Sequence, residues 1–282
     1  SKAKSLERSG LYEESFSLFK KINRDAPGIN KYFQPMKNYL KQTEAWDTLL
    51  VYTKNYANAR NQDFQSQLEL LDIYIWMDAE SEWQKIAFKL TQIQIINANM
   101  MKSVIHRLVE SGKHDFAYER LKEYRQKTGS IDFYSIEMGT FFGMRMIYDK
   151  AVQEYLLFLA THPQEFQNIS DRIMVYPDLP DIIDTITYIL SESPLQTAQF
   201  ILADLLFKQK FYTKGLEILQ SNEAPPIMLL NYAKDLVSVN EYMKAEKVLI
   251  GIINSDINEQ MVTKAIFEIA KIFEMKMIIT SL

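Results

Sequence analysis

The feature that most constrains this sequence of 282 residues is a segment that recurs at a fixed interval. The stretch that begins Gly10-Leu-Tyr-Glu-Glu returns as Gly112-Lys-His-Asp-Phe, 102 residues later, and 102 is three times 34. Weaker copies lie between and beyond these two segments. A period near 34, combined with apolar residues at helical spacing, predicts stacked pairs of helices rather than a single globular core.

Each copy can be aligned on the residue that lies two places after a turn suited to glycine. These anchor residues are 34 apart through the first six copies, and the last two intervals shorten to 30. Loops between helices tolerate such changes in length. The anchors are Tyr12, Trp46, Glu80, His114, Tyr148, Ile182, Tyr212 and Tyr242.

A small residue followed by apolar residues marks the second helix of each predicted pair. In the first copy this stripe is Ser15, Phe19 and Ile22, and Pro27 ends the helix. Gly139 lies inside a predicted first helix, where glycine costs about 1 kcal/mol relative to alanine. Its presence therefore predicts that two helices cross closely at this point.

These residues resemble the tetratricopeptide repeat (TPR) family. The second-helix pattern of the family is matched by Gly10, Tyr12, Ser15, Phe19, Ile22 and Pro27, and the small first-helix position by Gly139, Ala203 and Ala233. The resemblance implies an all-α fold, a right-handed α-solenoid of stacked antiparallel helix pairs with about eight repeats and both terminal repeats incomplete. It is weak around Glu80 and Ile182, where helical repeats of other families stay an alternative. Pro177 and Pro180 predict a short or bent first helix in the latter copy.

We expect one continuous repeat domain over residues 1–282. Its units are 1–27, 28–62, 63–97, 98–129, 130–163, 164–194, 195–225, 226–256 and 257–282. The chain begins inside a first helix, and a last second helix is expected to start near Met277 with only a few residues left. A capping helix is not visible, so we expect the sequence to be a piece of a longer protein.

Composition excludes several classes of function. The absence of cysteine excludes disulfides and thiolate metal sites. Lys and Arg number 32 against 36 Asp and Glu, and this net charge of -4 argues against nucleic acid as the partner. No apolar run approaches the roughly 18 residues of a membrane span. We expect a soluble chain and leave the compartment open between cytoplasm and periplasm.

No set of residues in the sequence predicts catalysis. His106, His114 and His162 do not form a complete set of metal ligands, and His114 at an anchor position suits a packed structural role. The sequence has no phosphate-binding loop and no nucleophile motif. We therefore expect no enzyme activity, cofactor or metal. Trp76 and Trp83 either fill an irregular junction or line a recognition pocket.

The resemblance further implies a concave groove lined by first-helix residues. Its lining on this chain is Lys31, Gln34, Asn38, Lys41, Asp72, Asn99, Lys102, His106, Phe133, Thr140, Phe200, Asp204, Phe207, Leu230 and Lys234. The polar, locally basic start suits a carboxylate-bearing segment. The apolar end suits an amphipathic helix or an extended apolar segment. The alternative for Phe133, Phe200 and Leu230 is packing between neighbouring repeats.

The sequence thus predicts a non-catalytic scaffold that binds another protein or peptide segment along this groove. One alternative is a structural subunit of a larger assembly, for example in the bacterial envelope or in secretion. The other is a regulatory repeat region of a multidomain enzyme or sensor. Asp72 stands where chaperone-binding TPR domains carry an asparagine, so a chaperone C-terminus is not the expected partner.

Overall fold

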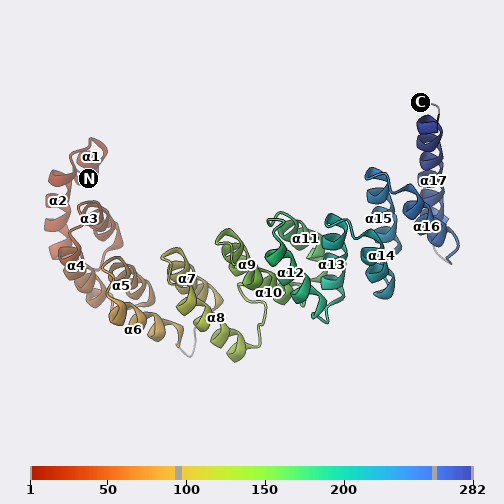
Figure 1. Cartoon of the computed structure of the whole chain (residues 1–282). Coiled ribbons are helices and arrows are strands. Elements are labelled where there is room, and N and C mark those ends of the chain that lie inside the picture. Colours follow the sequence, from red (N-terminus) through yellow and green to blue (C-terminus); the bar gives the residue numbers. More distant parts are fainter. Residues whose placement is uncertain (1, 93–96, 256–258, 281–282) are drawn as a thin grey trace. The chain divides into compact units, whose positions relative to one another are not determined.

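The computed structural model describes residues 2–92, 97–255 and 259–280. Over these ranges the chain forms seventeen α-helices, one short 3-10 helix and no strand (Figure 1). The chain divides into two compact units, Ser1–Ser130 and Ile131–Leu282, called unit 1 and unit 2 below, and each is described by itself. The expected all-α fold of stacked helix pairs is confirmed. The expectation of one continuous domain stays a prediction.

Unit 1 consists of four helix hairpins in which consecutive helices pack against each other. In Figure 1 the two helices of each hairpin lie side by side. The hairpins are α1 (Lys2–Arg8) with α2 (Tyr12–Asp25), α3 (Asn30–Gln42) with α4 (Trp46–Ala59), α5 (Phe64–Trp76) with α6 (Glu80–Thr91), and α7 (Ala98–Glu110) with α8 (His114–Thr128).

Unit 2 continues the same alternation with one irregular copy. Its helices are α9 (Ser135–Met144), α10 (Tyr148–Leu159), the 3-10 helix η1 (Pro163–Glu165), α11 (Phe166–Met174), α12 (Pro180–Ser191), α13 (Gln196–Lys208), α14 (Tyr212–Ser221), α15 (Pro226–Ser238), α16 (Tyr242–Ile253) and α17 (Glu259–Thr280). As expected, α11 is short, with nine residues. The prediction of a second helix that starts near Met277 is wrong, because α17 continues without a break to Thr280.

A left-handed turn precedes almost every second helix. Seven of the eight anchors are the first residue of their helix, whereas Ile182 lies two residues inside α12, which Pro180 begins. Two places before each of those seven anchors, the backbone has a positive φ of 52–77°. The next N–H donates to the carbonyl five residues earlier, as from Ala45 to Leu40 at 2.9 Å. This is the hydrogen bond of a Schellman motif, which caps a helix C-terminus.

Glycine occupies this left-handed position in only two of the seven turns, Gly10 and Gly112. Met146 holds it with φ 62°, and its side chain is 76% exposed. We expect Met146→Gly to stabilise the protein by about 0.5–1 kcal/mol, because the Cβ strain of a left-handed residue disappears.

The matched control is Met144→Gly, an equally exposed methionine at the last residue of α9, where the backbone is helical and glycine should cost up to about 1 kcal/mol. Thermal unfolding followed by circular dichroism measures both variants. Opposite shifts of the midpoint are expected, and a fall in both would contradict the role of the turn.

Small residues allow the close helix crossings that the sequence predicts. A Cβ added to Gly139 on α9 would lie 2.5 Å from Cε1 of Tyr155 on α10. The Tyr155 ring therefore takes the space that a side chain at Gly139 would need. Ala203 and Ala233 lie in the core of unit 2, with exposed fractions of 0% and 1%. In the part of the chain that is described, no helix is both long and apolar enough to span a bilayer.

Candidate functional site on the first-helix surfaces

The predicted groove residues of unit 1 lie on the first helices α3, α5 and α7. Lys31, Asn38, Lys41, Asn99 and His106 are exposed, whereas Gln34, Asp72 and Lys102 are partly buried. The ammonium group of Lys41 lies 3.9 Å from the centre of the Trp76 ring, and that of Lys31 lies 5.3 Å from the Tyr32 ring. Two of the predicted cations therefore lie over aromatic rings of their own surface.

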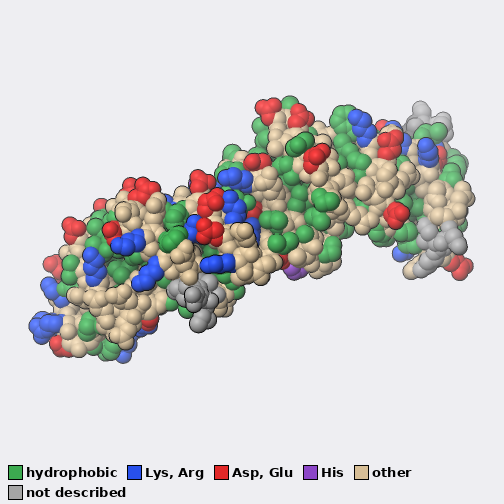
Figure 2. Space-filling model, turned by 90° about the horizontal axis from the view of Figure 1, so that it is seen from below, with side chains coloured by type: hydrophobic (Ala, Val, Ile, Leu, Met, Phe, Trp, Pro, Cys, Tyr) green, Lys and Arg blue, Asp and Glu red, His purple; other side chains and the backbone are tan. Residues whose placement is uncertain are grey.

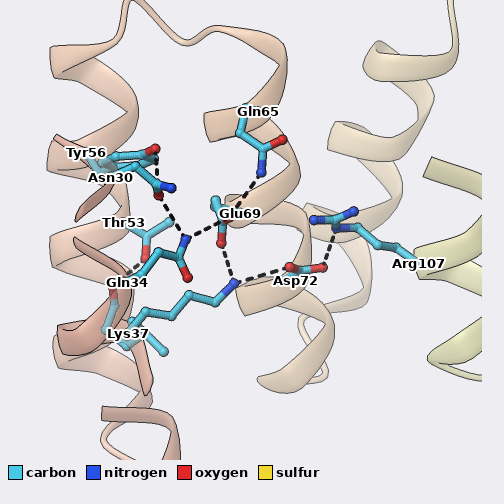
Figure 3. A network of polar contacts seen from close by, with 10 residues as sticks. Asn30, Gln34, Lys37, Thr53, Tyr56, Gln65, Glu69, Asp72 and Arg107 are labelled. Atoms are coloured by element: carbon cyan, nitrogen blue, oxygen red, sulfur yellow. Dashed lines mark hydrogen bonds and ion pairs between the residues drawn. The ribbon is translucent and has the colours of Figure 1, made fainter. Parts of the chain in front are cut away.

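A network of charged groups joins these helices (Figure 3). Lys37 of α3 forms an ion pair with Glu69 and another, at 3.3 Å, with Asp72 of α5. Arg107 of α7 donates from Nε to the other Asp72 oxygen at 3.0 Å. The side chains of Lys37 and Glu69 are only 10% and 5% exposed. The network therefore bridges three successive first helices through buried and partly buried, charge-assisted hydrogen bonds.

Two side-chain amide groups donate further hydrogen bonds to Glu69. Nε2 of Gln34 and Nε2 of Gln65 each donate to Oε1 of Glu69 at 3.2 Å. Burial raises the pKa of Asp72, while Lys37 and Arg107 oppose that shift. Asp72 is thus held by two cations of its own unit, and the network stabilises unit 1 internally.

Sequence reasoning named Asp72 and Gln34 but missed Lys37, Glu69 and Arg107. Lys37 occupies the eighth place of its helix, where α13 and α15 carry the buried Ala203 and Ala233. A lysine on this apolar stripe, with carboxylates 32 and 35 residues later, was the signal that could have revealed the network.

Unit 2 has a cavity of about 530 Å³ on its own first-helix surface. Its walls come from α11, α13 and α15, together with one residue of α14. The lining residues are Phe166, Gln167, Ser170, Asp171, Met174, Asp204, Phe207, Leu219, Ile227, Met228, Asn231, Tyr232 and Asp235. The structure therefore brings two of the predicted groove residues, Asp204 and Phe207, into one concave site.

The other predicted residues of unit 2 lie elsewhere. Leu230 is fully buried in the core, so its assignment to an accessible groove is corrected, and packing between repeats accounts for it. Phe200, 5% exposed, packs edge-on against Phe166 with ring centres 6.0 Å apart. Thr140 accepts a hydrogen bond from Arg172 at 2.9 Å. Lys234 lies 3.7 Å from Glu268, and Phe133 is partly buried beside the Tyr134 ring.

Three carboxylates lie in the cavity, and none of them has a cationic partner in the described ranges. Among the described residues, no Lys or Arg forms an ion pair with Asp171, Asp204 or Asp235. The Ser170 hydroxyl donates to Asp204 at 2.6 Å. Burial raises the pKa of Asp204 to about 6. The hydrogen bond from Ser170 lowers this pKa, whereas the neighbouring charges of Asp235 and Asp171 raise it further. Partial burial also raises the pKa of Asp235, although its side chain is exposed to solvent.

Aromatic side chains form the apolar side of the same cavity. The Phe207 ring lies edge-on to Tyr232, with centres 5.2 Å apart, and the Tyr232 hydroxyl donates to the Tyr212 carbonyl at 2.8 Å. Tyr232 is thereby fixed in place, and burial raises the pKa of its hydroxyl. The site combines a rigid aromatic wall with uncompensated negative charge.

The two units carry opposite net charge. Unit 1 has 20 Lys and Arg against 16 Asp and Glu, a net charge of +4, and unit 2 has 12 against 20, a net charge of -8. On the face drawn in Figure 2, basic side chains are frequent over unit 1 at the left and sparse over unit 2. The acidic cavity therefore belongs to the unit that already attracts cations.

The histidines form no metal centre. Nowhere in the described ranges do three His, Asp or Glu side chains gather as a metal site requires. His114 is the first residue of α8, and its Nε2 lies 3.9 Å from Asp115. Trp83 is buried and packs edge-on against Phe116, whereas the partly buried Trp76 lies beneath the Lys41 ammonium group.

The hairpin period, the left-handed turn before the second helix and the small residues at crossings define the class of this chain. Its fold is an all-α array of stacked helix hairpins, similar to the TPR fold. A scan against protein-family models found no match, and a search of curated proteins found none either.

A search of solved structures found chains to which this chain is similar over most of its length. The C-terminal part of a TPR repeat-containing protein from Cytophaga hutchinsonii is 13% identical, over 93% of this chain and 97% of that chain, with a TM-score of 0.40. The human IFIT1 dimer with m7Gppp-AAAA is 14% identical over 94% of this chain, with a TM-score of 0.32, and this chain covers 59% of its length. The P58(IPK) TPR domain is 10% identical over 97% of both chains, with a TM-score of 0.27.

Proposed function

We propose that this protein is a non-catalytic interaction scaffold, and that the cavity of unit 2 holds a cationic side chain of a partner segment. The observation that carries the proposal is the cavity of about 530 Å³ with three carboxylates and no cation paired to them among the described residues. The partly buried carboxylate of Asp204 is costly to ionise in this partly apolar site, and a partner's cation would offset that cost.

The shape of the lining suits lysine or arginine. Both side chains have a long aliphatic stem, which can lie along Phe166, Phe207 and Met228. The charged head would then reach Asp171, Asp204 and Asp235. Phe207 adds a ring face that attracts a cation. An apolar neighbour in the partner segment would cover the remaining wall.

Catalysis is not the favoured use of these groups. The Ser170 hydroxyl is committed to Asp204, and Ser170 is only 1% exposed. It therefore fixes the carboxylate in the wall rather than offering a nucleophile to a substrate. The two alternatives from the sequence, an assembly subunit and a regulatory repeat region, stay predictions.

Charge reversal at the rim of the cavity tests this function. Asp171 and Asp235 are exposed, so Asp171→Lys with Asp235→Lys should leave the fold intact. We expect the double variant to bind a short fluorescein-labelled Lys-rich peptide on an apolar background at least tenfold more weakly, about the loss expected for one charge-assisted contact. Fluorescence anisotropy measures the affinity.

The matched control is Asp184→Lys, an exposed position on α12 outside the cavity. It should retain the affinity of the parent chain. Equal affinity for Lys-rich and Gln-rich peptides, or undiminished binding by the double variant, would show that the cavity does not serve this purpose.

A further inference from the structure

A second cavity lies in unit 1 between the second helices α2 and α4, and it includes no first-helix residue. Its volume is about 650 Å³. The lining residues are Ser17, Lys20, Lys21, Asn23, Arg24, Pro27, Tyr52, Asn55, Asn58 and Ala59. It is thus separate in sequence and in chemistry from the acidic cavity of unit 2, and the function proposed above does not use it.

Asn23 is the unusual residue in this wall. It is 2% exposed, and its Oδ1 is buried without a hydrogen-bond partner among the described residues. The same place carries the buried apolar residues Ala57 in α4 and Leu159 in α10, and the buried Arg125 in α8. An unpaired buried amide destabilises a fold, so its presence in a cavity wall points to a donor supplied from outside.

The charged side chains that line this cavity are basic. Lys20, Lys21 and Arg24 all lie on α2, all are exposed, and all three line the opening. Arg24 lies 3.5 Å from Asp25, but both of those side chains are largely in solvent. Tyr52, Pro27 and Ala59 supply an apolar surface beside the cations.

We propose that this cavity binds an acidic peptide segment of a partner protein. Carboxylates of the segment pair with Lys20, Lys21 and Arg24. Oδ1 of Asn23 is itself buried, so the Asn23 amide turns toward the opening when it accepts a backbone N–H of the segment. An apolar side chain of the segment packs against Tyr52. A peptide is favoured over RNA because it offers an N–H donor, a carboxylate and an apolar group together, and because three cations are a small footprint for a polyanion.

Binding by the full chain is measured with three short fluorescein-labelled peptides, rich in Glu, Gln or Lys on the same apolar background, and with a single-stranded RNA oligonucleotide. The Glu-rich peptide should bind more tightly than the Gln-rich peptide, and its affinity should fall with added salt. Binding of the Lys-rich peptide belongs to the cavity of unit 2 and should not respond to substitutions in unit 1. Lys21→Glu with Arg24→Glu should abolish that preference, whereas Lys89→Glu, an exposed position on α6 outside the cavity, should not.

Asn23→Leu separates recognition from folding. We expect it to weaken binding of the Glu-rich peptide about tenfold while the unfolding midpoint stays the same or rises, because the unpaired amide is removed. Equal affinity for the Glu-rich and Gln-rich peptides overturns the proposal, and so does unchanged binding by Asn23→Leu. Tighter binding of RNA that is lost in the Lys21→Glu, Arg24→Glu variant would instead assign the surface to nucleic acid.

Discussion

Replacing Lys37 with methionine is expected to destabilise unit 1 by about 3–5 kcal/mol, the usual cost of breaking a buried ion pair by removing one partner. Glu69 and Asp72 would then keep their negative charges in a buried site, with Arg107 as their remaining cation. The contact between the Lys37 ammonium group and the Trp76 ring, 5.0 Å to its centre, would also be lost.

Tryptophan fluorescence during urea unfolding measures this change in one unit alone, because Trp46, Trp76 and Trp83 all lie in unit 1. Lys89→Met, at an exposed position, is the matched control and should stay within about 0.5 kcal/mol of the parent. Adding Glu69→Met to Lys37→Met should recover most of the loss, since apolar groups often replace a buried ion pair without cost. A loss below about 1 kcal/mol for Lys37→Met would mean that the network contributes little.

Asp204→Asn is expected to stabilise unit 2 by about 2–3 kcal/mol at pH 7.5, since a pKa displaced by two units corresponds to about 3 kcal/mol. The pKa of Asp204 is about 6 in the folded chain because of burial, against an ordinary value of 3.8. Asparagine keeps an acceptor for the Ser170 hydroxyl and removes the charge.

The gain should depend on pH in a definite direction. Between about pH 4 and pH 6 the folded chain holds the Asp204 proton while the unfolded chain releases it, so stability falls as the pH rises through this window. Above about pH 6 the folded chain bears the full free-energy cost of an ionised Asp204. Below about pH 4 Asp204 is protonated in both the folded and the unfolded chain, so the variant should have the same stability as the parent.

Urea unfolding at pH 4 and pH 7.5, followed by circular dichroism, compares the parent with Asp204→Asn. Tryptophan fluorescence serves as an internal control, because it reports unit 1 and should not change. Asp184→Asn, an exposed carboxylate outside the cavity, is the control for a change of net charge. A gain that is the same at both pH values would contradict the raised pKa of Asp204.

The repeat architecture could be predicted because its signals are local. A left-handed turn, the anchor two residues later and the stripe that follows all lie within one short segment, and seven anchors begin a helix. Ile182 departs from this rule because Pro180 begins α12 two residues earlier. Pro177 and Pro180 did predict the shortened helix before it.

The site could be predicted only in part, because its contacts join different copies. Asp204 and Phe207 were identified from their place on a first helix, yet Leu230, selected by the same rule, is buried. The fifth residue of a first helix faces the neighbouring repeat, as the buried Leu68 and Phe200 also show. Asn23 gave no signal in the sequence, because only the packed structure reveals an amide without a partner.

The alternating signs along α3, α5 and α7 make the hairpins of unit 1 non-interchangeable. Lys37, Asp72 and Arg107 follow one another at intervals of 35 residues, so each copy meets its opposite charge in the next. Excising the middle hairpin would bring two cations together, and duplicating it would set two acidic helices against each other. An array joined by apolar contacts alone could gain or lose a copy without this penalty. The charges on the first helices of unit 1 therefore favour one order of its copies, which constrains how such a chain can gain or lose copies during evolution.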